Sequence, residues 1–317
     1  MVARNRSMLL PLLAGALFLG ACESSTGSLE PGESRLTVQL TDAPGDLKEA
    51  RVRISKIILQ GTQTGDSTAA RQEFAVNSTE WIDLLKLSGG KFTELVSGAT
   101  VQPGTYSQLR VVVDGAYVVT SDDKVYATSG ATLPAGVTST GELKCPSCAQ
   151  SGFKVVFPGG ITVSDATTLL VDFDVNQSFG HEAGKSGKYI LKPVLIGTKK
   201  GGSGNTQPGT IGGTVALAQG VSIPACGGQA TLDLTRVVPT ATSGTVVRTG
   251  TTTAAGAYTI AAVAPGTYTL GVDRVGFANG DTLGFAATAT PATVTVASGA
   301  TAASSYSVTS ATCKVKG

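Results

Sequence analysis

The chain has 317 residues, only 15% of them charged, and a formal net charge of +2. This balance gives no electrostatic footprint for nucleic acid, and the single histidine, His181, excludes a multi-histidine metal site within one chain. The length fits two ordinary domains, and 41 glycines with frequent Thr, Ser and Val favour an all-β protein with many turns.

Residues 1–21 have the features of a secretory signal peptide: two early arginines, an apolar run over 8–18 that is too short to span a bilayer, and small residues before Cys22. The segment Leu19-Gly20-Ala21-Cys22 resembles the lipobox of bacterial lipoproteins. The resemblance implies cleavage before Cys22 and lipid on its thiol and amino group, which is enough for stable anchoring. The alternative is an ordinary cleaved signal peptide whose cysteine later pairs.

Residues 22–34 would then be the lipidated cysteine and a flexible tether rich in Ser, Gly and Pro. Residue 23 is glutamate, not the aspartate that favours inner-membrane retention in proteobacteria-like sorting. By that resemblance we expect an exported protein, anchored by lipid to the bacterial cell envelope at the outer membrane.

Two patterned blocks follow, 35–198 and 210–317, separated by a glycine-rich linker at 199–209. Alternating or β-rich patterns in the first block predict the strands 35–40, 50–60 (with a bulge near Lys56), 104–113, 153–157, 169–175 and 189–196, and a hairpin over 117–126. The segment 81–87 fits either a strand or one to two helical turns.

In the second block the strand pattern is more regular. Strands are predicted at 211–217, 230–237, 245–252, 258–261, 266–275, 292–296 and 303–308, with turns at a spacing typical of a β-sandwich. A Pro-Gly-Thr-Tyr turn-to-strand signal occurs in both blocks, at 103–106 and 265–268. We interpret this as repeated use of a good turn, not as domain duplication. The expected fold class is therefore all-β, with two β-sandwich-like domains in series.

Five ordered features give the first block a resemblance to a known family. They are Leu40-Thr41-Asp42-Ala43-Pro44, Trp81 with 83–87, 103–110, Asp172-Phe173-Asp174 with Ser178, and 191–194. Together they resemble domain of unknown function 4382, which is common in bacterial lipoproteins. The resemblance implies a β-rich, extracytoplasmic domain and brings no activity.

The second block resembles a carboxypeptidase regulatory-like domain, of the prealbumin-like or carbohydrate-binding-like β-sandwich group. The matching segments are 213–215, 230–234, 251–260 and 263–270, but Ala254 and Ala255 stand where an acidic residue is usual. Such domains are mostly structural or adhesive, and only some bind sugar. The aromatic residues that could stack on sugar are Tyr258, Tyr268, Phe277, Phe285 and Tyr306, and core packing is the competing role for them.

Asp172, Asp174 and Asn176 form a weak calcium candidate. Their spacing fits the opening of a calcium loop, but Gln177 and Ala183 stand where that loop needs Gly and Glu. On a strand the three residues would share one face, which could hold a cation or simply be solvated. We therefore predict neither a bound metal nor a cofactor.

With Cys22 lipidated, four cysteines remain for two disulfides. Cys226 and Cys313 bracket the second block, and we predict a bridge between them that fastens the terminal strand. Cys145 and Cys148 have redox spacing, but no helix start or βαβ pattern surrounds them, so a structural loop disulfide is expected.

Catalytic signatures are missing from the sequence: it has no Gly-x-Ser-x-Gly elbow and no phosphate loop, and His181 lies in a polar, glycine-containing segment. The expected function is a non-enzymatic envelope lipoprotein, a structural, adhesion or ligand-display module whose partner is a glycan or an envelope protein. A carbohydrate-binding module in the second block is the alternative, and an uncharacterised hydrolase in the first block is a more distant one.

Overall fold

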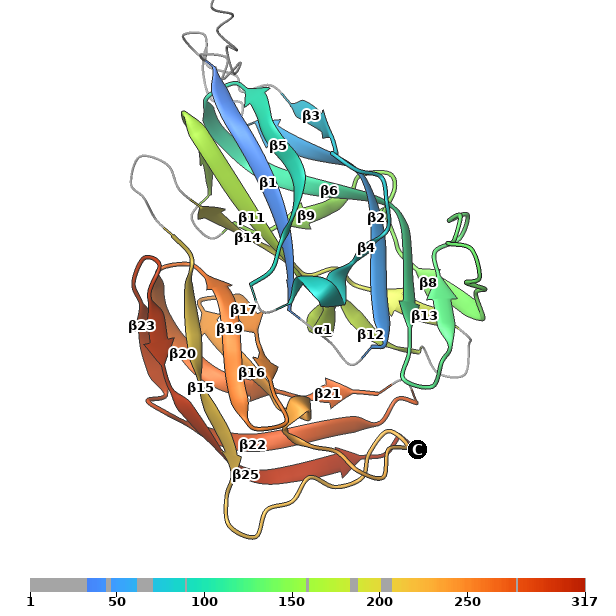
Figure 1. Ribbon diagram of the computed structural model, residues 1–317, viewed down its shortest axis with the longest axis vertical. Coiled ribbons are helices and arrows are strands. Elements are labelled where there is room, and N and C mark those ends of the chain that lie inside the picture. Colours follow the sequence, from blue (N-terminus) through green and yellow to red (C-terminus); the bar gives the residue numbers. More distant parts are fainter. Residues whose placement is uncertain are drawn as a thin grey trace, which may run out of the picture. The chain divides into compact units, whose positions relative to one another are not determined.

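The computed structural model describes residues 33–43, 47–61, 71–88, 90–157, 160–182, 188–200, 207–277 and 279–316 (Figure 1). The signal peptide, Cys22 and most of the tether lie outside these residues, as do residues 201–206 of the expected linker. Residues 32–317 form one compact unit. In the described residues, no helix has the length and apolar character needed to cross a membrane.

Strands dominate the described residues, so the all-β, sandwich-like prediction is confirmed. We call residues 33–200 the first half and residues 207–316 the second half. Each half contains two sheets, and the expected domain boundaries between the halves stay a prediction.

The first half has a four-stranded and a ten-stranded sheet. The four-stranded sheet has the order β14 (Leu195–Lys200), β11 (Ala166–Asp174), β1 (Ser34–Ala43), β5 (Thr93–Val101). The larger has the order β12 (Phe179–Glu182), β13 (Lys188–Leu191), β8 (Gly141–Lys144), β7 (Val125–Ala127), β6 (Gly104–Val119), β2 (Glu49–Gly61), β3 (Gln72–Ala75); β9 (Phe153–Val155) and β10 (Ile161–Val163) pair with β6, and β4 (Ile82–Asp83) pairs with β2. Two short helices complete it: the 3-10 helix η1 (Leu84–Leu87) and α1 (Val175–Ser178).

The two sheets of the first half share one apolar core. In β2 the alternation buries Val52, Ile54 and Ile57, and register shifts beside Ile54 show the predicted bulge. The predicted hairpin is present as the antiparallel pair β6–β7. The segment 81–87, which fitted either a strand or helical turns, contains both: the short strand β4 is followed by the helix η1.

The second half has a seven-stranded and a four-stranded sheet. The first has the order β18 (Thr251–Thr252), β19 (Ala257–Val263), β15 (Gly209–Leu217), β25 (Ser305–Lys314), β22 (Thr282–Thr290), β21 (Val275–Gly276), with β24 (Thr301–Ala303) paired to β15. The second has the order β17 (Val246–Thr249), β16 (Val238–Ser243), β20 (Gly266–Asp273), β23 (Thr293–Val296). A 3-10 helix, η2 (Leu234–Arg236), precedes β16, and the buried residues divide into two clusters.

The shared Pro-Gly-Thr-Tyr signal builds the same local contact in both halves. The Tyr106 hydroxyl donates to the carbonyl of Gln102 at 2.6 Å, and the Tyr268 hydroxyl donates to that of Ala264 at 2.8 Å. Each tyrosine thereby links the start of its strand to the residue before the turn, which explains why the same four residues suit two different sheets.

Several predicted strands were wrong. The segment 189–196 is two strands in different sheets, β13 and β14, with Pro193 between them. The segment 245–252 likewise divides at Gly250 into β17 and β18. The segment 230–237 contains η2, because the Asp233 carboxylate accepts from the backbone N–H of Thr235 at 2.9 Å and caps the helix.

Candidate functional site

A cluster of three carboxylates lies where two neighbouring strands end. Strands β1 and β11 are parallel, with Thr41 opposite Asp172 and Ala43 opposite Asp174. Because parallel strands end at the same edge of a sheet, this register brings Asp42, Asp172 and Asp174 to one edge. All three are buried, with exposed fractions of 6%, 5% and 0%, and we call them the carboxylate cluster.

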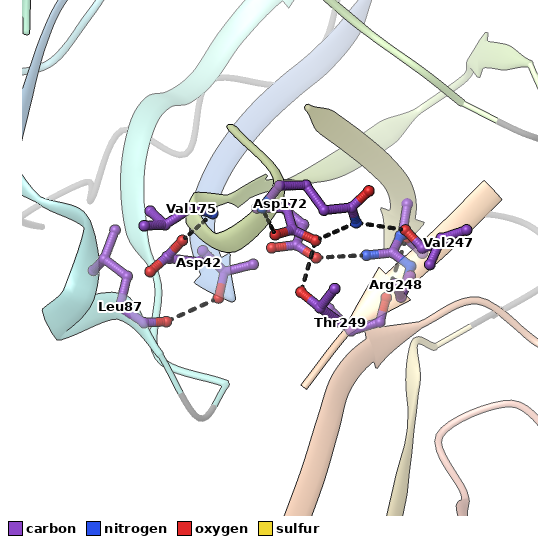
Figure 2. Close-up of polar contacts among 12 residues, drawn as sticks. Asp42, Leu87, Asp172, Val175, Val247, Arg248 and Thr249 are labelled. Carbon is purple, nitrogen blue, oxygen red and sulfur yellow. Dashed lines mark hydrogen bonds and ion pairs between the residues drawn. The ribbon is translucent and has the colours of Figure 1, made fainter. Parts of the chain in front are cut away.

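Asp172 forms a buried ion pair with the second half. Its Oδ2 accepts from Nη1 of Arg248 on β17 at 2.9 Å, and both side chains are almost fully buried (Figure 2). The other nitrogen, Nη2, donates to Oγ1 of Thr198 on β14 at 2.7 Å. Burial raises the pKa of Asp172, and the guanidinium of Arg248 opposes that rise. The pair therefore links the edge of the first half to β17.

Asp174 both begins a helix and contacts the second half. Its Oδ1 accepts from the backbone N–H of Gln177 at 2.9 Å, which caps α1. Its Oδ2 accepts from Nε2 of Gln177 and from Oγ1 of Thr249, each at 2.7 Å. Burial raises the pKa of Asp174 to about 6, and the neighbouring charge of Asp172 adds to the rise.

Asp42 was not predicted as a site residue. Its Oδ1 accepts from the backbone N–H of Val175 at 3.2 Å, so Asp42 helps to position the first residue of α1 (Figure 2). Its presence in the segment 40–44 was a visible signal, but only the parallel pairing of β1 with β11 shows that it belongs beside Asp172.

The calcium candidate does not have the geometry that its spacing suggested. Asn176 does not continue strand β11, because the strand ends at Asp174 and Asn176 lies in α1. Asp172 and Asp174 are bound by donors from the second half, and the cation beside Asp172 is Arg248. Within the described ranges, the only three potential metal-ligating residues whose ligand atoms all lie within 4.8 Å of one another are Cys226, Asp281 and Cys313. Both sulfurs there are in a disulfide, so that group offers no thiolate.

The carboxylate cluster has little room for a substrate. Strongly raised carboxyl pKa values beside one another are typical of catalytic sites. Here, however, the adjoining cavity, lined by Thr41, Asp42, Asp172 and Thr249 among others, has a volume of about 20 Å³. That is room for about one water molecule. The arrangement is therefore suited to joining the two halves.

Both expected disulfides are present. Cys145 and Cys148 are joined in the loop after β8, and Cys226 and Cys313 are joined across a sequence separation of 87. The second bridge fastens strand β25, which contains Cys313, to the segment that follows β15. Cys22, the expected lipidation site, lies outside the described residues.

The aromatic residues considered for sugar stacking are mostly in the core. Tyr258, Tyr268, Phe277 and Tyr306 are each at most 6% exposed, and Phe285 is half-buried against both clusters of the second half. Tyr258 and Tyr306 pack edge to face with ring centroids 5.1 Å apart. These five side chains therefore form no open platform. His181 lies in β12, and its side chain is outside what the structure describes.

Comparison with known proteins gives one family. The sequence profile described as Domain of unknown function (DUF4382) matches residues 33–193. No curated protein matches the chain.

Two solved structures show only distant similarity. One is a leucine-rich repeat protein from Bacteroides thetaiotaomicron VPI-5482, with 14% identity and a TM-score of 0.19; the match covers 88% of this chain and 26% of that one. The other is the major pilin from Streptococcus pyogenes, with 8% identity and a TM-score of 0.14, covering 89% of this chain and 99% of that one. The chain thus spans about a quarter of the first structure's length, and at these TM-scores neither bears on function.

Proposed function

We propose that this chain, which belongs to the family Domain of unknown function (DUF4382), is a non-enzymatic lipoprotein of the bacterial cell envelope, held on the outer membrane through Cys22. It acts as a structural, adhesion or ligand-display module. The observation that carries the proposal is the carboxylate cluster, in which one oxygen of Asp172 and one of Asp174 accept from donors of the second half, beside a cavity with room for about one water molecule.

The construction of the two halves supports a structural or display role. A buried ion pair and a buried hydrogen bond join them, at 2.9 Å and 2.7 Å, and a long-range disulfide closes the second half. Disulfides persist in oxidising compartments, which agrees with an exported location. The second half, as a carboxypeptidase regulatory-like module, would make the contacts with an envelope partner.

Lipid anchoring is tested by metabolic labelling with an alkyne fatty acid in a bacterial host. The full chain should take up label and sediment with membranes, whereas Cys22→Ser should do neither, because only the thiol of Cys22 accepts the diacylglyceryl group. The matched control is Cys145→Ser with Cys148→Ser, which removes two other cysteines and should keep the label. An unlabelled wild-type chain, or a labelled Cys22→Ser chain, would contradict the proposal.

A further inference from the structure

A groove of about 510 Å³ lies between strand β14 of the first half and strands β17 and β20 of the second. Its lining includes Phe157, Thr162, Lys199, Ser243, Arg248 and Tyr268. This volume is within the ~300–1,000 Å³ typical of small-molecule pockets. None of the five aromatic residues considered from the sequence, apart from Tyr268, contributes to it.

The apolar part of the groove has a defined shape. Phe157 is half-buried, and its ring lies so close to Gly197 that a Cβ atom there would be 2.1 Å from Cζ of the ring. Only glycine at position 197 lets the ring of Phe157 pack directly against the backbone of β14. Tyr268 and Pro265 line the groove from the second half. The groove therefore offers ring and aliphatic surface that the apolar face of another ring could contact.

Among the described residues, the charged lining of the groove is entirely basic. These residues include Lys199 and Arg248 and no carboxylate. Arg248 is already paired with Asp172. Lys199 is half-buried, and its ammonium group has no hydrogen-bond or ion-pair partner in the described part of the chain. One unpaired positive charge remains, which selects a ligand with one negative charge.

From these features we infer that the groove binds a sugar acid, that is, a pyranose ring carrying one carboxylate. The carboxylate pairs with Lys199, and one face of the ring packs on Phe157. The hydroxyls of Thr162 and Ser243, at the exposed rim, form hydrogen bonds with the sugar hydroxyls. The inference rests on the ligand-display part of the proposed function and names its ligand class. It places the site between the halves, not on the second half alone.

The test is isothermal titration of the purified full chain with galacturonic acid, with its uncharged methyl ester, and with trigalacturonic acid. The acid should bind at least about tenfold more tightly than the ester, because hydrogen bonds to charged groups contribute about 1.5–3 kcal/mol. Binding of the monomer indicates recognition of free or terminal sugar acid, and binding of the trimer alone indicates recognition within a polymer. Either result supports the inference.

Lys199→Gln should weaken that binding at least about tenfold without changing the melting temperature, because its ammonium group forms no hydrogen bond or ion pair with the described residues. The matched control is Lys144→Gln, an exposed lysine on β8 that does not line the groove. Equal binding of acid and ester, no binding of either acid, or full binding by Lys199→Gln would overturn the inference. Lipid labelling at Cys22 is measured separately, so failure here leaves that result intact.

Discussion

The two halves of the molecule hold themselves together in different ways. The first half buries one continuous core between its sheets, and its disulfide spans a sequence separation of only 3. The buried residues of the second half divide into two smaller clusters, and its disulfide spans 87 residues. We therefore expect the first half to depend mainly on apolar burial and the second half to gain more of its stability from covalent closure.

The largest expected effect comes from opening the long disulfide. Replacing Cys226 and Cys313 by alanine should lower the free energy of unfolding of the second half by about 4.5 kcal/mol, because the unfolded chain regains the entropy that a loop of this length loses. Differential scanning calorimetry should show the loss in the transition of the second half.

Opening the short disulfide is the matched control for that comparison. Replacing Cys145 and Cys148 by alanine frees a much smaller loop, so the same entropy model gives a loss of about 2 kcal/mol. Equal losses for the two double variants would contradict the difference drawn between the halves.

The next largest loss of stability is expected at the joint between the halves, by which we mean the contacts of Asp172 with Arg248 and of Asp174 with Thr249. Arg248→Met leaves the Asp172 carboxylate buried without its cation, which should cost about 4 kcal/mol in urea unfolding. Adding Asp172→Leu removes the orphaned charge as well, so the double variant should recover most of the loss. A double variant as unstable as Arg248→Met would show that the pair matters for its hydrogen bonds to neighbours and not for its charge.

The raised pKa of Asp174 predicts that the stability of the protein falls as the pH rises. Its pKa is about 6 in the folded protein, against about 3.9 in an unfolded chain, so the folded state holds the proton more tightly. Stability from this group is therefore complete below about pH 4 and is lost as the pH rises through 6, by about 3 kcal/mol. The charges that face it are Asp172, which strengthens the effect, and Arg248, which is paired with Asp172.

The measurement is urea unfolding of the wild type and Asp174→Asn between pH 4 and 7.5. The variant carries no titratable group at this position, so the difference between the two curves isolates Asp174 from the other carboxylates. Asp174→Asn should gain stability over the wild type as the pH rises through 6. A constant difference would mean that Asp174 does not titrate in this range.

Much of the fold was predictable where strands alternate or end in strong turns, as in β2, β6 and the β6–β7 hairpin. Prediction failed where one residue changes the partner of a strand. Pro193 and Gly250 each interrupt an apparently continuous strand, and the strand segments on either side of each residue join different sheets. Strand β16 was missed because Pro239 stands inside it, and proline normally argues against a strand in the middle of a sheet.

The candidate site was predictable only in part. Spacing drew attention to Asp172 and Asp174, but it placed them on one strand face with Asn176, either at a cation site or in solvent. Their real partners are Arg248 and Thr249, at sequence separations of 76 and 75. Nothing local marks those two residues, because the contacts depend on how β17 lies against the end of β11. The disulfides were predictable because four cysteines allow few pairings once Cys22 is set aside.

The smallest expected effect isolates one hydrogen bond across the joint. Thr249→Val keeps the shape of the side chain but removes the Oγ1 donor to Asp174, which should cost about 1.5 kcal/mol at pH 7.5. That donor also lowers the pKa of Asp174, so its removal should move the pKa further up. Below pH 6 Asp174 is protonated, the bond is no longer charge-assisted, and the loss should shrink. Thr312→Val, at an exposed position of β25, is the control and should change stability by less than about 0.5 kcal/mol. A loss for Thr249→Val that is the same at pH 5 and pH 7.5 would mean that the bond joins neutral partners at both pH values and that its contribution does not depend on the charge of Asp174.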